Sequence, residues 1–200
     1  MKLILTRHGE TFENAAGIIQ GHLPGKLSPL GKRQTEKLAV RLKSEKIDLI
    51  YSSDLTRAAD TAKEIAQFHQ QIPLQLLKEI RGRKYGYFEG KKRSEIEANP
   101  RAAALFKSMY EAPPEGENWP DVYERAKIFL NQIISRHQNQ TVLVVSHRGF
   151  LRSLICAIRK QPPQEMFNIH KIENTSISIF EIEKTTEYQT VLFNCTKHLE

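Results

Sequence analysis

Two histidines in this sequence each stand beside an arginine and follow a short apolar segment. Arg7 precedes His8, and Arg148 follows His147. Arginine offers forked, permanently charged donors to phosphate oxygens, and the imidazole of histidine can accept a phosphoryl group as a nucleophile. The pattern therefore predicts a site for phosphoryl chemistry that depends on the fold bringing the two histidines together.

A third position of the same kind carries Arg57. The segment 47–52 has the composition of a strand and runs through a polar turn into a helix that begins near Leu55. Asp54 is well placed to cap this helix, and Arg57 falls in its first turn. Helix N-termini add unpaired N–H groups that favour an anion, so this third strand end is expected to join the other two.

Other chemistry finds little support. The remaining histidines lack such a context and are expected to be structural or on the surface; they are His22, His69, His137, His170 and His198. No Gly-x-x-x-x-Gly-Lys-Ser/Thr loop is present to cradle a nucleoside triphosphate, and no histidines and acids have metal-site spacing. Cys156 and Cys195 form no Cys-x-x-Cys motif, and Cys156 is expected to be a buried thiol. We therefore expect neither a metal nor a cofactor.

The elements that must position these residues can be read from apolar periodicity and turn signals. The pattern predicts strands over 2–5, 47–52, 74–77, 141–146, 176–182 and 189–193, the last two closing around a turn at 184–188. It predicts helices that begin at Pro29 after Ser28 and near Leu55, and further helices around 94–110 and over 150–159.

Strands that alternate with helices indicate a three-layer α/β/α fold with a mostly parallel sheet and a mixed edge. Ligands of such sheets bind beyond the carboxyl ends of the strands, which is where the histidines fall. The alternation breaks over about 84–120, and we interpret this stretch as a lid insertion within a single domain over 1–200.

Composition limits the class further. The chain has 200 residues, 40% of them hydrophobic, and a net charge of +7, which excludes wholesale disorder and fibres. No apolar run is long enough to span a bilayer, and no signal-peptide core follows Met1, so we expect a cytoplasmic protein with no membrane partner. The positive charge favours an anionic partner, but the basic residues are dispersed, so a local anion pocket fits better than nucleic-acid binding.

A series of motifs then appears in order along residues 2 to about 180. They are Arg7-His8-Gly9-Glu10-Thr11 with Asn14; Gln20-Gly21; Leu27-Ser28-Pro29-Leu30-Gly31 with Gln34; Ser52-Ser53-Asp54-Leu55-x-Arg57-Ala58-x-x-Thr61-Ala62; Tyr85-Gly86-x-x-Glu89-Gly90; Gly116-Glu117 before Arg125; and Val144-Val145-Ser146-His147 with Arg152. Together they resemble the histidine phosphatase superfamily, which includes phosphoglycerate mutases.

The resemblance implies a role for each matching residue. His8 would attack phosphorus and become transiently phosphorylated, while Arg7, Arg57 and His147 would surround the phosphoryl group and Asn14 would donate a further hydrogen bond. For in-line attack, His8 must be neutral on its attacking nitrogen, with its other N–H held by an acceptor such as a backbone carbonyl.

Two positions depart from the family pattern. The family usually has glycine after the second histidine, where this chain has Arg148, which either contacts phosphate or points into solvent. More seriously, the glutamate that protonates the leaving oxygen usually sits four residues before the glycine equivalent to Gly86, and that position is Gly82. Glu79 lies three residues earlier and is a candidate acid, although an odd offset on a strand points to the other face. Otherwise Glu79 has a surface role.

The resemblance implies a cofactor-independent, acid phosphatase-like phosphomonoesterase of the shorter phosphatase branch, acting on a small phosphorylated substrate. A phosphoglycerate mutase is the first alternative. A phosphate-ester or phosphoprotein binding module that has lost turnover is the second, and Gly82 supports it. The basic cluster Lys84, Lys91, Lys92 and Arg93 would contact a second phosphate or form a solvated face. Neither the substrate's identity nor the oligomeric state follows from the sequence.

Overall fold

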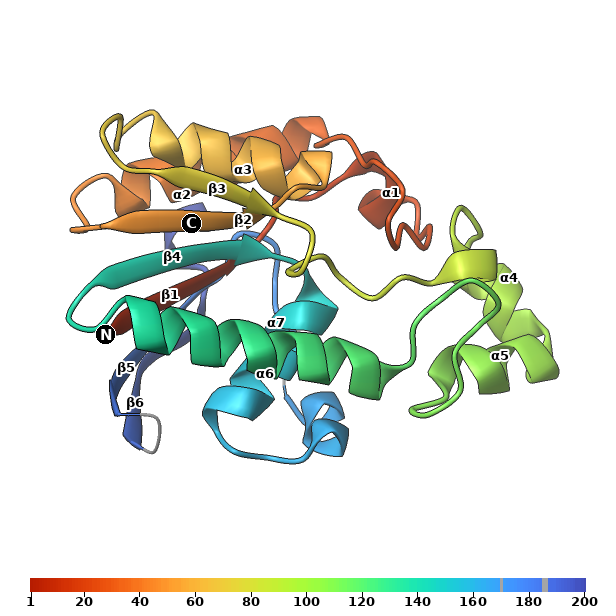
Figure 1. The fold of residues 1–200 in the computed structure, drawn as a ribbon. Coiled ribbons are helices and arrows are strands. Elements are labelled where there is room, and N and C mark those ends of the chain that lie inside the picture. Colours follow the sequence, from red (N-terminus) through yellow and green to blue (C-terminus); the bar gives the residue numbers. More distant parts are fainter. Residues whose placement is uncertain (170, 185–186) are drawn as a thin grey trace.

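A six-stranded sheet in the order β3-β2-β4-β1-β5-β6 forms the centre of the protein (Figure 1). The structure, a computed structural model, describes residues 1–169, 171–184 and 187–200. The strands are β1 (Lys2–Arg7), β2 (Leu49–Ser53), β3 (Leu74–Leu77), β4 (Thr141–Ser146), β5 (Ile177–Lys184) and β6 (Glu187–Cys195). The first four strands in the sheet order are parallel to one another. β5 is antiparallel to β1, and β6 is antiparallel to β5.

Helices cover both faces of the sheet (Figure 1). The longer ones are α2 (Pro29–Leu42), α3 (Thr56–Ala66), α6 (Trp119–Arg136) and α7 (Arg148–Ile158); the short ones are α1 (Phe12–Ala15), α4 (Arg93–Ala98) and α5 (Pro100–Lys107), with 3-10 turns η1 (Gly86–Phe88), η2 (Pro163–Phe167) and η3 (Lys197–Leu199). Figure 1 places α2 and α3 on one face and α6 and α7 on the other. The predicted three-layer α/β/α fold is confirmed.

Side-chain alternation along the strands explains the two helical layers. In β4, Leu143 and Val145 pack with α2 and α3, whereas Val142 and Val144 pack with α6 and α7. All four side chains are completely buried. Successive side chains of a strand point to opposite faces, so an uninterrupted apolar strand requires helices on both sides of the sheet.

The predicted helix starts had mixed outcomes. Ser28 caps α2 as expected, because its hydroxyl accepts a hydrogen bond from the Gly31 N–H at 3.0 Å. Asp54 does not cap α3, whose N-cap is Leu55 without a side-chain bond. Asp54 instead binds the Arg81 guanidinium through both carboxylate oxygens, at 2.6 and 2.5 Å. Because both oxygens of the Asp54 carboxylate are engaged in this bidentate ion pair, the carboxylate does not accept from the first N–H groups of α3.

The insertion also differs from its prediction. The helix expected over 94–110 is two helices, α4 and α5, interrupted at Asn99, whose extended backbone precedes Pro100. Proline disfavours helical geometry in the residue before it, and the Asn99 side chain then caps α5. Figure 1 shows both helices beyond the edge at which the parallel strands end.

One long helix was absent from the predicted elements. α6 buries Val122, Ala126, Phe129, Leu130 and Ile133 on one face. Among the described residues, no helix has the length and apolar character needed to cross a membrane. Two of the sequence interpretations, the structural role of His170 and the turn at 184–188, fall wholly or partly outside the described residues.

Candidate active site

The structure brings the predicted histidines and two arginines together at the carboxyl ends of three neighbouring strands. Arg7 ends β1 and His8 follows it, His147 follows β4, and Arg57 lies in the first turn of α3 after β2. The ring centroids of His8 and His147 are 5.1 Å apart. All four side chains are buried, with exposed fractions between 3% and 7%.

The orientation of His8 is fixed by its neighbours. Its Nδ1 lies 2.7 Å from the carbonyl oxygen of Gly9, and a carbonyl can only accept, so Nδ1 carries the proton and Nε2 keeps its lone pair. A Cβ atom on Gly9 would lie 2.6 Å from Thr35 Oγ1 and 2.7 Å from the Gly31 carbonyl oxygen, so only glycine fits there. The backbone carbonyl that holds the ring is itself held in place.

Electrostatics keeps both rings uncharged. Burial lowers the pKa of His8 well below its ordinary value, and the charges of Arg57 and Arg7 lower it further. Burial, followed by Arg57 and His8, lowers the pKa of His147 in the same direction. A neutral imidazole is the form that can attack phosphorus.

His147 occupies the N-cap position of α7 without a side-chain capping bond, and its ring contacts Ser53 at the end of β2. Its Nε2 lies 2.8 Å from Ser53 Oγ, while its Nδ1 is buried and has no partner among the described residues. The Ser53 hydroxyl also accepts a hydrogen bond from the Leu55 N–H. Sequence matching included Ser53 in a motif without giving it a role.

In both arginines a terminal guanidinium nitrogen donates a hydrogen bond, whereas Nε has no partner among the described residues. Arg7 donates to the carbonyl of Ile172 at 2.9 Å, and Arg57 donates to the carbonyls of Leu23 and Gly21 at 2.9 and 2.8 Å. In both, Nε is buried without a partner. Burial lowers the pKa of Arg7 to about 9 and that of Arg57 to about 10. An oxyanion beside them would supply the missing acceptor and counter-charge.

A cleft of about 700 Å³ opens beside this cluster. Arg7, Asn14 and Arg148 line it, and so does Gln20, whose Oε1 is buried and unpartnered. Asn14 uses its Oδ1 to accept from the Thr11 N–H at 3.3 Å, which leaves its amide N–H groups available. Gln20 was missed as a site residue, although the Gln20-Gly21 motif already marked its position.

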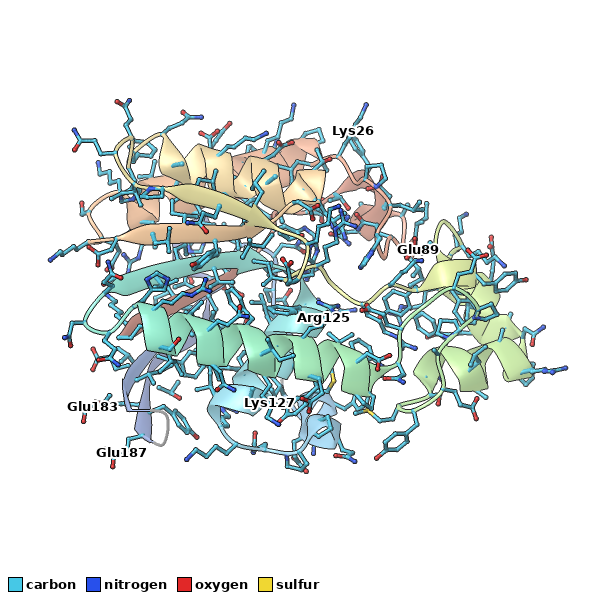
Figure 2. All side chains as sticks on the ribbon, in the orientation of Figure 1. Lys26, Glu89, Arg125, Lys127, Glu183 and Glu187 are labelled. Atoms are coloured by element: carbon cyan, nitrogen blue, oxygen red, sulfur yellow. The ribbon has the colours of Figure 1, made fainter. Side chains whose placement is uncertain are left out.

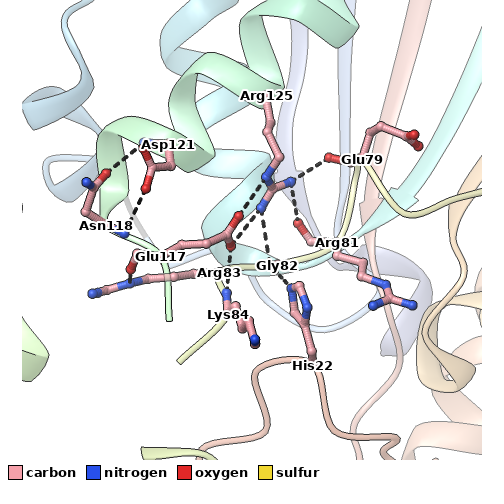
Figure 3. A network of polar contacts seen from close by, with 10 residues as sticks. All are labelled: His22, Glu79, Arg81, Gly82, Arg83, Lys84, Glu117, Asn118, Asp121 and Arg125. Carbon is pink, nitrogen blue, oxygen red and sulfur yellow. Dashed lines mark hydrogen bonds and ion pairs between the residues drawn. The ribbon is translucent and has the colours of Figure 1, made fainter. Parts of the chain in front are cut away.

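Gly82, where the family has its acid, and Glu79, the candidate replacement, lie in different places. Gly82 borders the site, since a Cβ atom there would lie 3.0 Å from the Cβ of His147. The structure does not bring Glu79 to the cluster: its side chain is exposed and lines a separate cavity with Tyr51 and Phe129. Figure 3 shows the Glu79 carboxylate pointing away from Gly82. Glu89 is structural, because its Oε1 accepts the N–H groups of His22 and Tyr85.

A polar network holds the segment around Gly82 (Figure 3). Arg125 pairs with Glu117 through Nε to Oε1 at 3.0 Å, and its Nη1 donates to the carbonyls of Glu79 and Arg81 at 2.5 and 3.2 Å. On the other side, His22 Nε2 lies 2.9 Å from the Gly82 carbonyl oxygen. Because the ring nitrogen and the guanidinium both bind backbone oxygens, they fix the path of this segment past His147.

Fold and site together define a class: an α/β protein with two buried histidines and two buried arginines at the carboxyl edge of a mostly parallel sheet. Residues 3–196 match the model of the histidine phosphatase superfamily (branch 1). The chain belongs to this family. Among the described residues, no three histidine, cysteine or acidic side chains gather into a group that could hold a metal ion.

Several relatives are phosphatases by name. Phosphoserine phosphatase 1 of Hydrogenobacter thermophilus is 36% identical, with 100% of this chain and 94% of the relative covered. Phosphoglycerate mutase-like protein 4 of Arabidopsis thaliana is 32% identical, with 100% and 87% covered. The structure of YhfR from Bacillus stearothermophilus superimposes with a TM-score of 0.90 at 31% identity, over 100% of this chain and 99% of that one.

Proposed function

We propose that this chain is a phosphomonoesterase that transfers the phosphoryl group of a small phosphorylated metabolite to His8 and then to water. One observation carries the proposal. The Gly9 carbonyl holds Nδ1–H of His8 and leaves Nε2 as a free nucleophile within a pocket of buried arginines. Membership of a family with several phosphatase relatives supports it.

The proposed reaction has two steps. His8 Nε2 forms a bond to phosphorus as the bond to the leaving oxygen breaks, and that oxygen keeps the electron pair. Water then attacks the phosphohistidine, the P–N bond breaks, and a proton from the water passes to solvent. Arg7 and Arg57 stabilise the charge on the equatorial oxygens in both steps, with Asn14 as a further donor.

His147 would serve as a neutral hydrogen-bond donor. If the Ser53 hydroxyl donates to Nε2, the proton of the ring resides on Nδ1, the nitrogen that has no protein partner. Ser53 then positions His147 and selects its tautomer. Arg148, at the start of α7, adds a charged donor on the cleft wall.

The insertion would act as the lid. It contributes Tyr85 and Arg93 to the cleft wall, so the leaving group would contact this segment. The leaving oxygen receives no proton from position 82, and we assign Glu79 no catalytic role because its carboxylate lies in another cavity. Both cysteines, Cys156 and Cys195, are free thiols, which suits the cytoplasmic location that we propose.

The test compares p-nitrophenyl phosphate with an alkyl phosphate, using the wild-type chain and His8→Ala. Wild-type activity that His8→Ala removes, together with a trapped phosphohistidine, is the expected result. His69→Ala is the matched control, because the ring of this histidine contacts the Leu42 carbonyl, away from the cluster. Activity that survives in His8→Ala would refute the mechanism.

Gly82 favours a second candidate function, a phosphate-ester binding module without turnover. Saturable binding of a phosphate ester that never leads to hydrolysis or a phosphoenzyme would select this candidate. A third outcome, transfer between 2- and 3-phosphoglycerate with dependence on a bisphosphate primer, would instead assign the chain as a mutase.

A further inference from the structure

A second cavity adjoins the cleft and shares three of its wall residues. It has a volume of about 340 Å³, and Tyr85, Arg93 and Arg148 line both spaces. A substrate whose phosphoryl group lies beside His8 would therefore extend its leaving group past these three residues. The composition of the second cavity then restricts what that leaving group can be.

The walls of this cavity carry an excess of positive charge, and only one of their cations, Arg93, has an acidic partner among the described residues, Glu97 at 3.4 Å. Arg93, Lys107, Arg148 and Arg152 line it, and no described acidic residue does. The guanidinium of Arg148 makes no hydrogen bond or ion pair with a described residue. Arg152 donates to the carbonyl of Ile169 at 2.6 Å, yet its Nε is buried without a partner. Unpaired guanidinium groups around a cavity favour an anionic ligand.

The rest of the wall is aromatic and fixed. Trp119 packs edge-to-face against Phe167 with ring centroids 5.8 Å apart, and Phe106 completes this side. A Cβ atom on Gly149 would lie 2.9 Å from the Trp119 ring, so glycine is required for the start of α7 to approach so closely. The cavity thus suits an organic group attached to an anion.

Gly82 adds a chemical restriction. Without a proton donor at this position, the leaving oxygen must depart with its negative charge. An alkoxide is a strong base and departs slowly, whereas a phosphate monoester has a second pKa of about 6 and departs readily as an anion. A phosphate leaving group would also supply the negative counter-charge that Arg148 and Arg152 lack among the cavity residues.

We infer that the preferred substrate is an organic phosphoanhydride, whose terminal phosphoryl group goes to His8 and whose leaving phosphate binds in the cavity lined by Arg148 and Arg152. This inference rests on the proposed function, since it uses the same nucleophile, and it extends the reaction from phosphomonoesters to phosphoanhydrides. His8 Nε2 bonds to the terminal phosphorus, and the bridging P–O bond breaks with its electron pair on the leaving phosphate. Water then hydrolyses the phosphohistidine as before.

ADP, inorganic pyrophosphate, glycerol phosphate and p-nitrophenyl phosphate are the probes, in buffer with a metal chelator. We expect kcat/KM for ADP to exceed that for glycerol phosphate at least about 100-fold, since an absent general acid costs an alkyl ester about 10²–10⁴. Pyrophosphate should also be cleaved faster than glycerol phosphate. The inference is overturned if neither anhydride exceeds glycerol phosphate while p-nitrophenyl phosphate is hydrolysed through His8, a result that leaves the proposed function intact.

Charge-removing variants test the cavity itself. Arg148→Gln should lower the ratio of ADP to p-nitrophenyl phosphate kcat/KM at least about tenfold, as expected when a charged donor to the leaving oxygen is lost. Lys107→Gln, an exposed residue whose replacement leaves the core untouched, should lower the ratio in the same direction. Arg33→Gln, an exposed arginine on α2 that lines neither space, should leave it unchanged. Unchanged ratios in both cavity variants would overturn the assignment.

Discussion

Gly82 lies directly against His147. A Cβ atom on Gly82 would be 3.0 Å from the Cβ and 3.2 Å from the Cγ of His147, so any side chain at position 82 would start beside the second histidine of the cluster. The glycine therefore occupies a position from which a carboxylate could reach the leaving oxygen, and its effect on the reaction can be tested by substitution.

Gly82→Glu should restore a general acid. We expect the rate with an alkyl phosphate to rise about 100-fold, and the rate with p-nitrophenyl phosphate to change far less, because nitrophenolate leaves without a proton. His147 must shift by a few tenths of an ångström to admit the new Cβ. Gly82→Gln has the same shape without the acid, and an equal gain in both variants would contradict the explanation.

The pH dependence of activity should reflect the buried histidines. Burial and the neighbouring arginines lower the pKa of His8 and of His147, so both rings stay neutral down to a pH below 6.5. The acid limb of kcat/KM for p-nitrophenyl phosphate should therefore lie below pH 6.5. A limb centred at or above that value would show that the rings are not held neutral.

The same shifts should make the fold sensitive to acid. Below pH 6.5 the unfolded chain binds protons that native His8 and His147 do not, so the free energy of unfolding should fall as pH falls. Each histidine contributes up to about 1.4 kcal/mol per pH unit until its native pKa is reached. Urea unfolding between pH 7.5 and 5.5 measures this slope. His8→Gln should reduce it, and an unchanged slope would count against the prediction.

Phosphate or vanadate should stabilise the protein strongly. Both anions would accept from the unpartnered Nε groups of Arg7 and Arg57 and offset their buried charge. At 100 times its dissociation constant, a ligand adds about 2.7 kcal/mol, which corresponds to a rise in Tm of about 5–10 °C in a chain of this size. Scanning calorimetry at matched ionic strength in chloride provides the control. Full stabilisation in Arg57→Met would refute the assignment.

Ser53→Ala should impair catalysis with little effect on substrate binding. The variant loses the 2.8 Å contact with His147 Nε2, and a typical hydrogen bond of about 1 kcal/mol predicts a fall in kcat of roughly fivefold. Ser52→Ala is the matched neighbour, because its hydroxyl binds the Ser53 carbonyl and does not contact the histidine. Steady-state kinetics distinguishes the two, and equal losses would remove the special role of Ser53.

Arg125 should matter for stability more than other cations of its helix. Arg125→Met removes the ion pair with Glu117 and the donors to backbone carbonyls (Figure 3), at a cost of about 2–3 kcal/mol and a fall in Tm of about 4–10 °C. Lys127→Met, on the same helix (Figure 2), removes only an exposed pair with Glu124 and should change Tm by less than about 2 °C. Equal shifts would show that the network is not stabilising.

Much of the fold could be predicted because apolar periodicity reports burial. The buried strand 141–146 and the short strand 74–77 were predicted with their observed bounds. The interruption at Asn99 was also open to prediction, because proline follows it. α6 was missed although its apolar residues recur at helical spacing, since no element was predicted between the end of the insertion at about 120 and the strand that begins at 141.

The site was predictable where each residue stands at the end of a strand or shortly after it. Arg7, His8, Arg57 and His147 meet because the carboxyl ends of parallel strands share one edge. Ser53 and the cationic cavity could not be predicted in this way, because they depend on side-chain contacts between residues far apart in sequence. The position of Glu79 was settled by the Arg125 network, which binds its carbonyl and leaves its carboxylate outside.

The sheet order also has a consequence for synthesis on the ribosome. β1 pairs only with β4 and β5 among the described strands, and both are made long after it. Since chains grow from the N-terminus, β1 has neither of its partner strands until residues 141–146 have left the ribosome. The strand that precedes His8 is thus translated before both of the strands with which it pairs, so a nascent chain truncated before β4 contains His8 but not the cluster that surrounds it.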